Sequence, residues 1–387
     1  MPFIRSQNVR FEGLSLDDVV FINEDTHDEM QSSAVLPNDV LFNITGASIG
    51  RCCKVPAQFS GAANVNQHVC IVRPTRAVST AYLTYVLSSP VGQTQMALSQ
   101  DGISREGLSF ERLAQFTIPL PPLETQRRIA SYLDRETAEI DRLIAAKERL
   151  LTLLAEKRRA LITHAVTKGI YQKFEPDLLH EGHSQVLSNG WEFVQLKRVA
   201  PIIDCKHKTV PFVLAGIPLA SIREVQSWEV DLTNAKMTTE DEYLSMIEGD
   251  RDPREGDIII SRNATVGETA LVKKETHFCM GQDVALIRPN YRLQSQFANW
   301  VFRSDFVREQ VKIASVGATF FRINVDQIRS LTVPLPPVAL QRDISLFLST
   351  RLNQYAKVES KTQASVEMLR ERRSVLIAAA VTGELSI

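Results

Sequence analysis

The chain has 387 residues, of which 44% are hydrophobic and 23% are charged, and its formal net charge is −1. This length is too great for one ordinary domain, and the near-neutral charge excludes a strongly basic chain that binds nucleic acid through charge alone. Five cysteines without metal-ligand spacing predict neither a zinc site nor a disulfide framework. The chain begins without a signal peptide and has no apolar run of membrane-spanning length, so we expect a cytoplasmic protein without membrane contact.

A segment of mixed α and β pattern begins the chain. Residues 40–42 follow a Pro-Asn-Asp turn and predict a short buried strand, and residues 69–72 predict a second strand. A loop of small residues, 44–51, lies between the two strands. A helix is expected after Ser79, where apolar residues take up helical spacing. The segment is therefore expected to fold as a globular domain with both helices and strands.

A long helical pattern follows the sequence Ile-Pro-Leu-Pro-Pro at residues 118–122. Consecutive prolines disfavour helix before Leu123. From there apolar residues recur every three to four positions for about 45 residues, until Gly169. At 1.5 Å per residue such a helix is on the order of 65 Å long. Because its other positions are mostly charged, the narrow apolar stripe requires a partner helix.

The same order of features returns in the second half of the chain. After a polar linker, residues 256–260 match residues 38–42, and residues 262–267 match the loop of small residues. Residues 281–289 match residues 66–74, and a second Pro-Leu-Pro-Pro run begins a second long helical pattern. Self-similarity of this kind predicts a tandem repeat of a globular segment followed by a helix.

The repeat divides the chain into five segments. They are a first globular domain, a first helix, a linker, a second globular domain and a second helix, at residues 1–117, 118–169, 170–190, 191–332 and 333–387. Residues 191–217 have no counterpart before Met1. We therefore expect the first globular domain to be N-terminally incomplete.

No catalytic constellation is recognisable in the sequence. Neither a phosphate-binding loop nor a dinucleotide fingerprint is present, and the absence of any Asn-Pro dipeptide excludes the usual site of an amino-methyltransferase. The seven histidines are scattered singly. We predict no catalytic residue and no metal site.

The motif Pro-Leu-Pro-Pro followed by Gln-Arg-x-Ile, at residues 119–129 and again at 334–344, resembles the specificity (S) subunit of type I restriction-modification systems. The resemblance covers nearly the whole chain. It implies an α+β fold in which two α/β target-recognition domains are separated by two long antiparallel helices. These helices are expected to form a coiled-coil spacer, and the tandem repeat is expected to have pseudo-two-fold symmetry.

The resemblance also implies a function. The chain is expected to be a non-catalytic subunit that reads a split, asymmetric target on double-stranded DNA. The expected protein partners are two methyltransferase (M) subunits, together with restriction (R) subunits that can join them. S-adenosylmethionine, ATP and Mg are expected only in those partner subunits, so no cofactor is assigned to this chain. Independently, two similar units on a rigid spacer suit half-sites about one helical turn (roughly 34 Å), or a multiple of it, apart.

Contacts with DNA are expected on the irregular loops, because strands and helices position them rigidly. Arg and Lys can hold phosphates, while Arg, Asn and Gln can also read base edges. The residues expected to contact DNA are Thr45, Ser48, Arg51 and Arg105 in the first domain and Lys206, Lys208, Arg262, Asn263, Thr265 and Arg322 in the second. For each of them the competing interpretation is an ordinary solvated charge or turn residue. Gln67 and Gln282, at matching positions, are interpreted as residues that fix a turn through side-chain hydrogen bonds.

Two other functions remain open at this point. The chain could be an adaptor that joins two protein ligands without binding DNA, which would need no basic surface common to both globular domains. It could also be an enzyme, which would require a cofactor pocket that no motif predicts.

Overall fold

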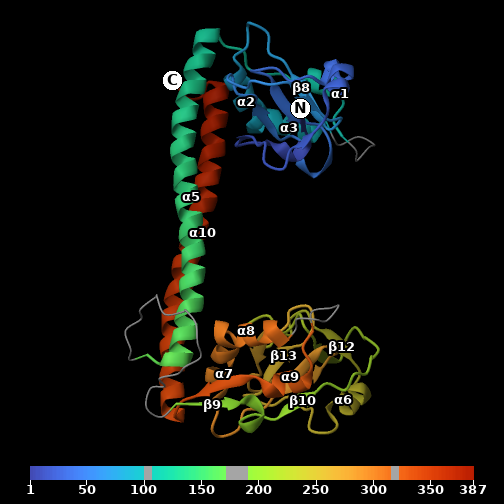
Figure 1. Ribbon diagram of the computed structural model, residues 1–387, viewed down its shortest axis with the longest axis vertical. Coiled ribbons are helices and arrows are strands. Elements are labelled where there is room, and N and C mark those ends of the chain that lie inside the picture. Colours follow the sequence, from blue (N-terminus) through green and yellow to red (C-terminus); the bar gives the residue numbers. More distant parts are fainter. Residues whose placement is uncertain (100–106, 171–190, 315–321) are drawn as a thin grey trace. The chain divides into compact units, whose positions relative to one another are not determined.

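The computed structural model describes residues 1–99, 107–170, 191–314 and 322–387. The chain divides into two compact units (Figure 1): unit 1 is Met1–Arg149 with Thr362–Ile387, and unit 2 is Leu150–Lys361. The two long helices are α5 (Leu123–Lys168) and α10 (Val338–Thr382), and each unit contains a part of both. Arg105 and most of the predicted linker lie outside the described residues.

Unit 1 contains two small sheets and a hairpin beside its part of the long helices. One sheet is β6 (Cys52–Lys54), β5 (Val40–Asn43) and β8 (Val69–Val72), all antiparallel, and the other is β4 (Val20–Phe21), β1 (Pro2–Ile4) and β7 (Asn64–Val65). The hairpin is β2 (Val9–Arg10) and β3 (Gly13–Leu14). The short helices are α1 (Glu24–Glu29), α2 (Thr80–Ser88), α3 (Pro90–Leu98) and α4 (Phe110–Ala114). All four residues of β5 are buried, as the apolar run predicts.

Unit 2 repeats this plan with additional strands. Its main sheet is β10 (Ile202–Asp204), β16 (Val284–Ile287), β13 (Ile258–Ser261) and β14 (Thr269–Leu271), and a second sheet is β12 (Lys236–Thr238), β11 (Ile217–Ala220) and β15 (Cys279–Met280). A further pair is β17 (Thr332–Leu335) with β9 (Glu192–Gln195). The short helices are α6 (Glu240–Ile247), α7 (Ser295–Phe302), α8 (Asp305–Ala314) and α9 (Val325–Ser330).

The strands of the two units correspond in order and direction. β1 runs parallel to β7 as β11 runs parallel to β15, and β5 lies between two antiparallel neighbours as β13 does. The main difference is β10, which pairs with the outer edge of β16. Among the described residues of unit 1, β8 pairs with β5 alone. Among the described residues, this sheet of unit 1 therefore has one strand fewer than the main sheet of unit 2.

A buried glutamine explains the Pro-Leu-Pro-Pro motif with its Gln-Arg. Gln126 is fully buried; its Oε1 accepts a hydrogen bond from the backbone of Ser79 (2.8 Å), and its Nε2 donates to the carbonyls of Ala77 (3.1 Å) and Pro121 (2.8 Å). In unit 2 the equally buried Gln341 makes the same three bonds, to the backbone of residues 294, 292 and 336. Each glutamine thus ties the start of a long helix to the chain just before a short one.

A second shared feature is a bidentate ion pair at the start of each central strand. Asp39, directly before β5, pairs with Arg73 (2.7 and 2.8 Å), and Asp257, directly before β13, pairs with Arg288 (2.9 to 3.2 Å). Both carboxylates are buried. Buried charges need such partners, so the pairs fix the strand that leads to the loops described below.

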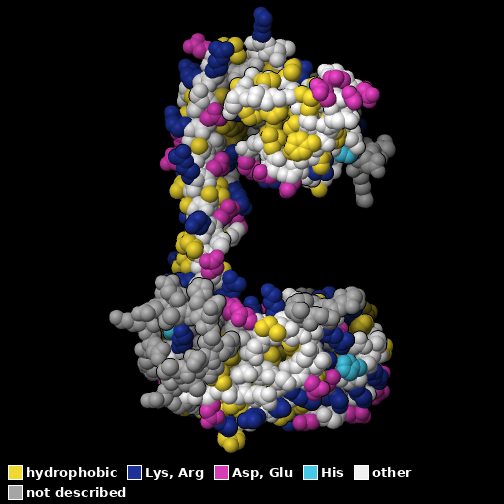
Figure 2. Space-filling view, viewed as in Figure 1, with side chains coloured by type: hydrophobic (Ala, Val, Ile, Leu, Met, Phe, Trp, Pro, Cys, Tyr) yellow, Lys and Arg dark blue, Asp and Glu magenta, His cyan; other side chains and the backbone are white. Residues whose placement is uncertain are grey.

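The long helices pack antiparallel within each unit. In unit 1, Arg373 pairs with Asp141 (2.9 Å) and Arg370 with Glu148 (2.7 Å), above a core that contains Leu133. In unit 2, α5 and α10 enter a core with Ile162 and Leu348. Figure 2 shows Lys and Arg side chains interspersed with Asp and Glu along the helices. None of the described helices is long and apolar enough to cross a membrane.

Candidate nucleic-acid interface

A cluster of three segments lies at the end of β5 in unit 1. We call it loop cluster 1; it consists of residues 45–51, 66–68 and 107–108. The backbone of Ile44 joins all three, because its N–H donates to the carbonyl of His68 (3.0 Å) and its carbonyl accepts from Leu108 (2.7 Å). Short backbone hydrogen bonds of this kind hold irregular segments in fixed relative positions.

Loop cluster 2 occupies the same position in unit 2 and consists of residues 262–267, 281–283 and 322–323. Here Arg262 replaces Ile44: its N–H donates to the carbonyl of Asp283 (2.8 Å), and its carbonyl accepts from Ile323 (3.0 Å). The two clusters therefore share one backbone frame with different side chains. That combination can present two different patterns of donors and acceptors.

The exit of the first loop is set by a glycine in each cluster. Gly50 has φ +86° and Gly267 has φ +87°. Their N–H groups donate to the carbonyls of Asn43 (2.8 Å) and Ser261 (2.9 Å), which closes each loop. A side chain at either position would strain this left-handed backbone. The repeated glycines thus keep the loops tight at the strand ends.

Loop cluster 1 contains three of the predicted DNA-contacting residues. The Thr45 hydroxyl bonds His68 Nδ1 (2.6 Å), which fastens the first loop to the neighbouring turn. The Ser48 hydroxyl accepts from Asn43 Nδ2 (3.1 Å). The Arg51 side chain is exposed. Thr45 and Ser48 therefore shape the loop, while Arg51 is open to an external phosphate or base.

Loop cluster 2 brings together four predicted residues. Asn263 and Arg322 face each other in an isolated β-bridge, and Arg322 pairs with Asp283 (3.5 Å) while its side chain stays 47% exposed. The Thr265 hydroxyl bonds the Ser261 hydroxyl (3.1 Å). The Arg262 guanidinium is buried, pairs with Asp204 and donates to the Ile323 carbonyl (3.3 Å), so it holds the loop from inside.

Lys206 and Lys208 lie outside loop cluster 2. Lys206 Nζ contacts Glu248 (2.6 Å) and the carbonyl of Ser245 (2.8 Å), and Lys208 Nζ pairs with Glu242. Both ammonium groups are thus bound to α6 or to the residue after it. Contact with DNA would require them to leave these partners, and their role as DNA contacts stays a prediction.

Three potential metal ligands meet beside Arg262. The Sγ of Cys205 lies 3.5 Å from His207 Nδ1, and His207 Nε2 lies 3.0 Å from an oxygen of Asp204. Both ring nitrogens are engaged within the group, and Arg262 takes the other oxygen of Asp204. Burial raises the pKa of the Cys205 thiol, which disfavours the thiolate that a metal would need. The group fits a hydrogen-bonded chain that orients Asp204 towards Arg262.

The interpretation of Gln67 and Gln282 as turn-fixing residues is wrong. Both are exposed, and Gln282 Nε2 donates to the Thr209 hydroxyl (2.9 Å) rather than to its own turn. In unit 1 it is Asn66 that holds the turn, because its Oδ1 accepts from the N–H of His68 (3.2 Å). Sequence reasoning also missed His68 and Asp283. Their only signal was their matching place before β8 and β16.

The fold and its two loop clusters define a class of protein: a tandem recognition protein in which two similar globular domains carry loops with different side chains. A family model described as type I restriction modification DNA specificity domain matches residues 2–152 and 189–368. The chain therefore belongs to this family. It is a DNA-target specificity subunit, which is non-catalytic, and specificity subunits of type I systems act within multi-subunit complexes with DNA.

Individual relatives agree over the whole chain. The EcoKI specificity subunit of Escherichia coli strain K12 is 21% identical over 402 residues, which cover 100% of this chain and 82% of that protein. The StySPI specificity subunit of Salmonella potsdam is 21% identical over 406 residues, with 100% and 82% covered. The comparisons give no support to an adaptor that does not bind DNA.

Solved structures show the same fold. A chain from a structure of a type I R-M system aligns with a TM-score of 0.78 at 19% identity, covering 99% of this chain and 92% of that chain. The HsdS subunit from Thermoanaerobacter tengcongensis aligns with a TM-score of 0.57 at 18% identity, covering 99% and 90%. The predicted fold class, two α/β domains with a spacer of long antiparallel helices, is confirmed.

Proposed function

We propose that each loop cluster reads one half of a bipartite, asymmetric DNA target. The observation that carries the proposal is the shared backbone frame of the two clusters with its mostly different side chains: Ile44 and Arg262 make equivalent backbone bonds, but apart from the matching Gln67 and Gln282 most loop and turn side chains differ. Equal frames place two readers in equivalent positions on DNA. Unequal side chains make the two half-sites unequal in sequence.

Within each cluster, the exposed side chains are the proposed readers. These are Arg51 and Gln67 in cluster 1 and Gln282 and Arg322 in cluster 2. Arginine can bond guanine in the major groove and glutamine can bond adenine. Thr45, Ser48 and Arg262 would hold the loops in shape and would not contact bases themselves, because their polar groups are already bonded within the protein.

We further propose that two methyltransferase subunits, and restriction subunits where they are present, assemble on this chain in the cytoplasm. S-adenosylmethionine, ATP and Mg would be used by those partners. The formal net charge of −1 supports a division of labour. Affinity for DNA comes largely from phosphate neutralisation, so the partners would clamp the DNA while this chain selects the sequence.

Methylome sequencing tests the proposed reading. In cells that carry this gene with its methyltransferase, we expect methylation at a motif split into two different halves by unread base pairs. A continuous or palindromic motif would contradict the proposal. Binding of target duplexes should also be tight only when the methyltransferase subunit is added; tight specific binding by the isolated chain would refute the division of labour.

A further inference from the structure

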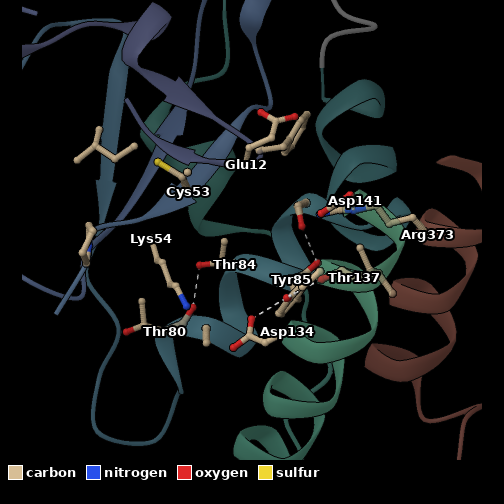
Figure 3. Close-up of a pocket in the computed structure, with 18 of the residues that line it drawn as sticks. Glu12, Cys53, Lys54, Thr80, Thr84, Tyr85, Asp134, Thr137, Asp141 and Arg373 are labelled. Carbon is tan, nitrogen blue, oxygen red and sulfur yellow. Dashed lines mark hydrogen bonds and ion pairs between the residues drawn. The ribbon is translucent and has the colours of Figure 1, made fainter. Parts of the chain in front are cut away.

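Unit 1 contains a cleft of about 1460 Å³ between its globular part and its long helices, and all the lining residues belong to unit 1. Figure 3 shows its walls: Glu12 and Lys54 on the strand side, Thr84 and Tyr85 on α2, and Asp134 on α5. Sites for small molecules occupy about 300–1,000 Å³. The size and the open form of this cleft therefore suit a polypeptide better than a metabolite.

The repeat identifies the equivalent place in unit 2. Ser15 N–H donates to the Asn8 carbonyl (2.9 Å) as Asp231 N–H donates to the Glu224 carbonyl (3.0 Å), so Glu12 corresponds to Trp228. The paired glutamines accept from Ser79 and Gln294, which align α2 with α7. The remaining correspondences follow from this alignment: Tyr85 with Trp300, and Ser88 with Arg303.

In unit 2 this place is filled by the chain itself. The Trp228 ring packs against Trp300 with centroids 4.0 Å apart and ring planes tilted by 39°, and the Arg303 guanidinium lies 5.2 Å from the Trp228 centroid. Arg303 Nη2 also donates to the carbonyls of Ser227 (2.6 Å) and Thr269 (2.8 Å). An aromatic ring and a guanidinium thus form a plug against the wall of α7, held by stacking and cation–π attraction.

At the equivalent positions of unit 1, Glu12 and Ser88 replace the tryptophan and the arginine of the plug, and carboxylates lie on the helix wall. Asp134, Asp141 and Glu148 follow one face of α5 at intervals of seven residues. Asp141 and Glu148 have arginine partners on α10. Asp134 has no ion pair among the described residues: one oxygen accepts from the Tyr85 hydroxyl (2.7 Å), and the exposed carboxylate retains a second oxygen. Asp134 can therefore attract a cation, although Lys54, Arg370 and Arg373 also line the cleft.

We propose that the cleft of unit 1 binds a segment of a protein partner that places an aromatic ring against Tyr85 and a guanidinium beside Asp134. The partner would supply in trans the aromatic–arginine pair that unit 2 carries in its own chain as Trp228 and Arg303. The cleft contains no residue of loop cluster 1, so this docking site is distinct from the DNA-reading site. A protein partner could therefore bind there while DNA occupies the cluster.

The test uses the full chain and a blocked dipeptide amide, acetyl-Trp-Arg-amide, observed by saturation-transfer NMR at millimolar concentration. Acetyl-Trp-Glu-amide is the matched ligand with reversed charge. We expect transfer to the arginine dipeptide and little to the glutamate one. The variant that combines Glu12→Trp with Ser88→Arg rebuilds the plug of unit 2 in unit 1, and it should weaken binding by at least about tenfold, or about 1.4 kcal/mol.

A gentler variant keeps the test decisive if the plugged variant fails to fold. Asp134→Asn retains an acceptor for Tyr85 but removes the charge, and Glu139→Gln is its control, because Glu139 is exposed on α5 outside the cleft. Only Asp134→Asn should weaken binding. Absence of binding to the wild-type chain, equal binding of both dipeptides, or binding that survives the plug would overturn the proposal. A self-dimer abolished by the plug would instead assign the cleft to a second copy and also overturn it.

Discussion

Units 1 and 2 share two sets of buried polar residues and differ in most of the exposed side chains at the loop clusters and the cleft. Gln126 and Gln341 make the same three hydrogen bonds, and Asp39 and Asp257 each accept a bidentate arginine. Apart from Gln67 and Gln282, most side chains of the loop clusters and of the cleft walls differ. The repeat therefore preserves a frame that holds loops at a strand end, while the residues available to contact other molecules mostly differ between the units.

The largest expected effect comes from removing the arginine that pairs with the buried aspartate before the central strand of each unit. Arg288→Ala should destabilise unit 2 by about 3–5 kcal/mol, because it leaves Asp257 buried without a cation. Arg73→Ala should destabilise unit 1 by less, since the Arg73 side chain is 51% exposed against 17% for Arg288, and water can replace it. Hydrogen exchange resolved by peptide mass spectrometry measures each unit separately.

The control for this pair of variants is Arg292→Ala, which removes an exposed ion pair with Glu192. Such pairs contribute about 0–1 kcal/mol, so exchange in unit 2 should hardly change. If Arg73→Ala destabilised its unit as much as Arg288→Ala does, burial would not set the strength of the pair. The two ion pairs would then contribute more nearly equal stability than the exposed fractions of Arg73 and Arg288 indicate.

The two buried glutamines should behave alike. Gln126→Ala and Gln341→Ala each leave a backbone N–H and two carbonyls without partners, at about 2 kcal/mol or more. The prediction is a similar loss of stability in each unit, seen by the same exchange measurement. Gln363→Ala, at an exposed position of α10, is the control and should change stability by less than about 0.5 kcal/mol. A large effect in one unit alone would show that the motif has different roles in the two repeats.

The two loop clusters should differ in the half of the target that they read, although their backbone frames agree. Arg51→Ala should relax selectivity in one half of the split target and Arg322→Ala in the other, each by about 1–3 kcal/mol of discrimination. Competition binding of the assembled methyltransferase with duplexes altered in a single half measures this. Lys273→Ala, which removes an exposed residue paired with Glu229, serves as the control and should leave both halves unchanged. A change in both halves from one arginine would break the assignment of one cluster to each half.

Much of the frame could be predicted from the sequence, because apolar spacing, prolines and repeated motifs determine where its strands and helices form. The strand at residues 40–43 and the helix start at Leu123 follow from patterns that depend on neighbours in sequence. The repeat also extends to β1 and β11, since the two strands make the same parallel pairing. Repetition supplied long-range information that one copy of the motif lacks.

The sites were harder to predict, because a side chain's availability depends on distant partners. Lys206 and Lys208 look like free cations in sequence, but Glu248 pairs with Lys206 from 42 positions later and Glu242 pairs with Lys208 from 34 positions later. The glutamine in the turn looks structural, yet Asn66 holds that turn. The cleft is lined by six separate segments, and it is the filled counterpart in unit 2 that makes it interpretable.

The smallest predicted effect tests whether the cores of the two units are equally protected from solvent. Burial raises the pKa of Cys70 in unit 1 and of Cys279 in unit 2 to about 11, from an ordinary 9.0. Each buried neutral thiol therefore contributes stability that is fully present below pH 9 and is lost as the pH rises towards 11. At pH 8 both thiols should react with iodoacetamide about a hundredfold more slowly than in the urea-unfolded chain, because each pKa unit changes the thiolate fraction tenfold. Mass spectrometry of the labelled peptides, with the unfolded chain as the control, measures both rates at once. Much faster labelling of Cys70 would mean that unit 1, whose sheet has one strand fewer among the described residues, opens more readily than unit 2.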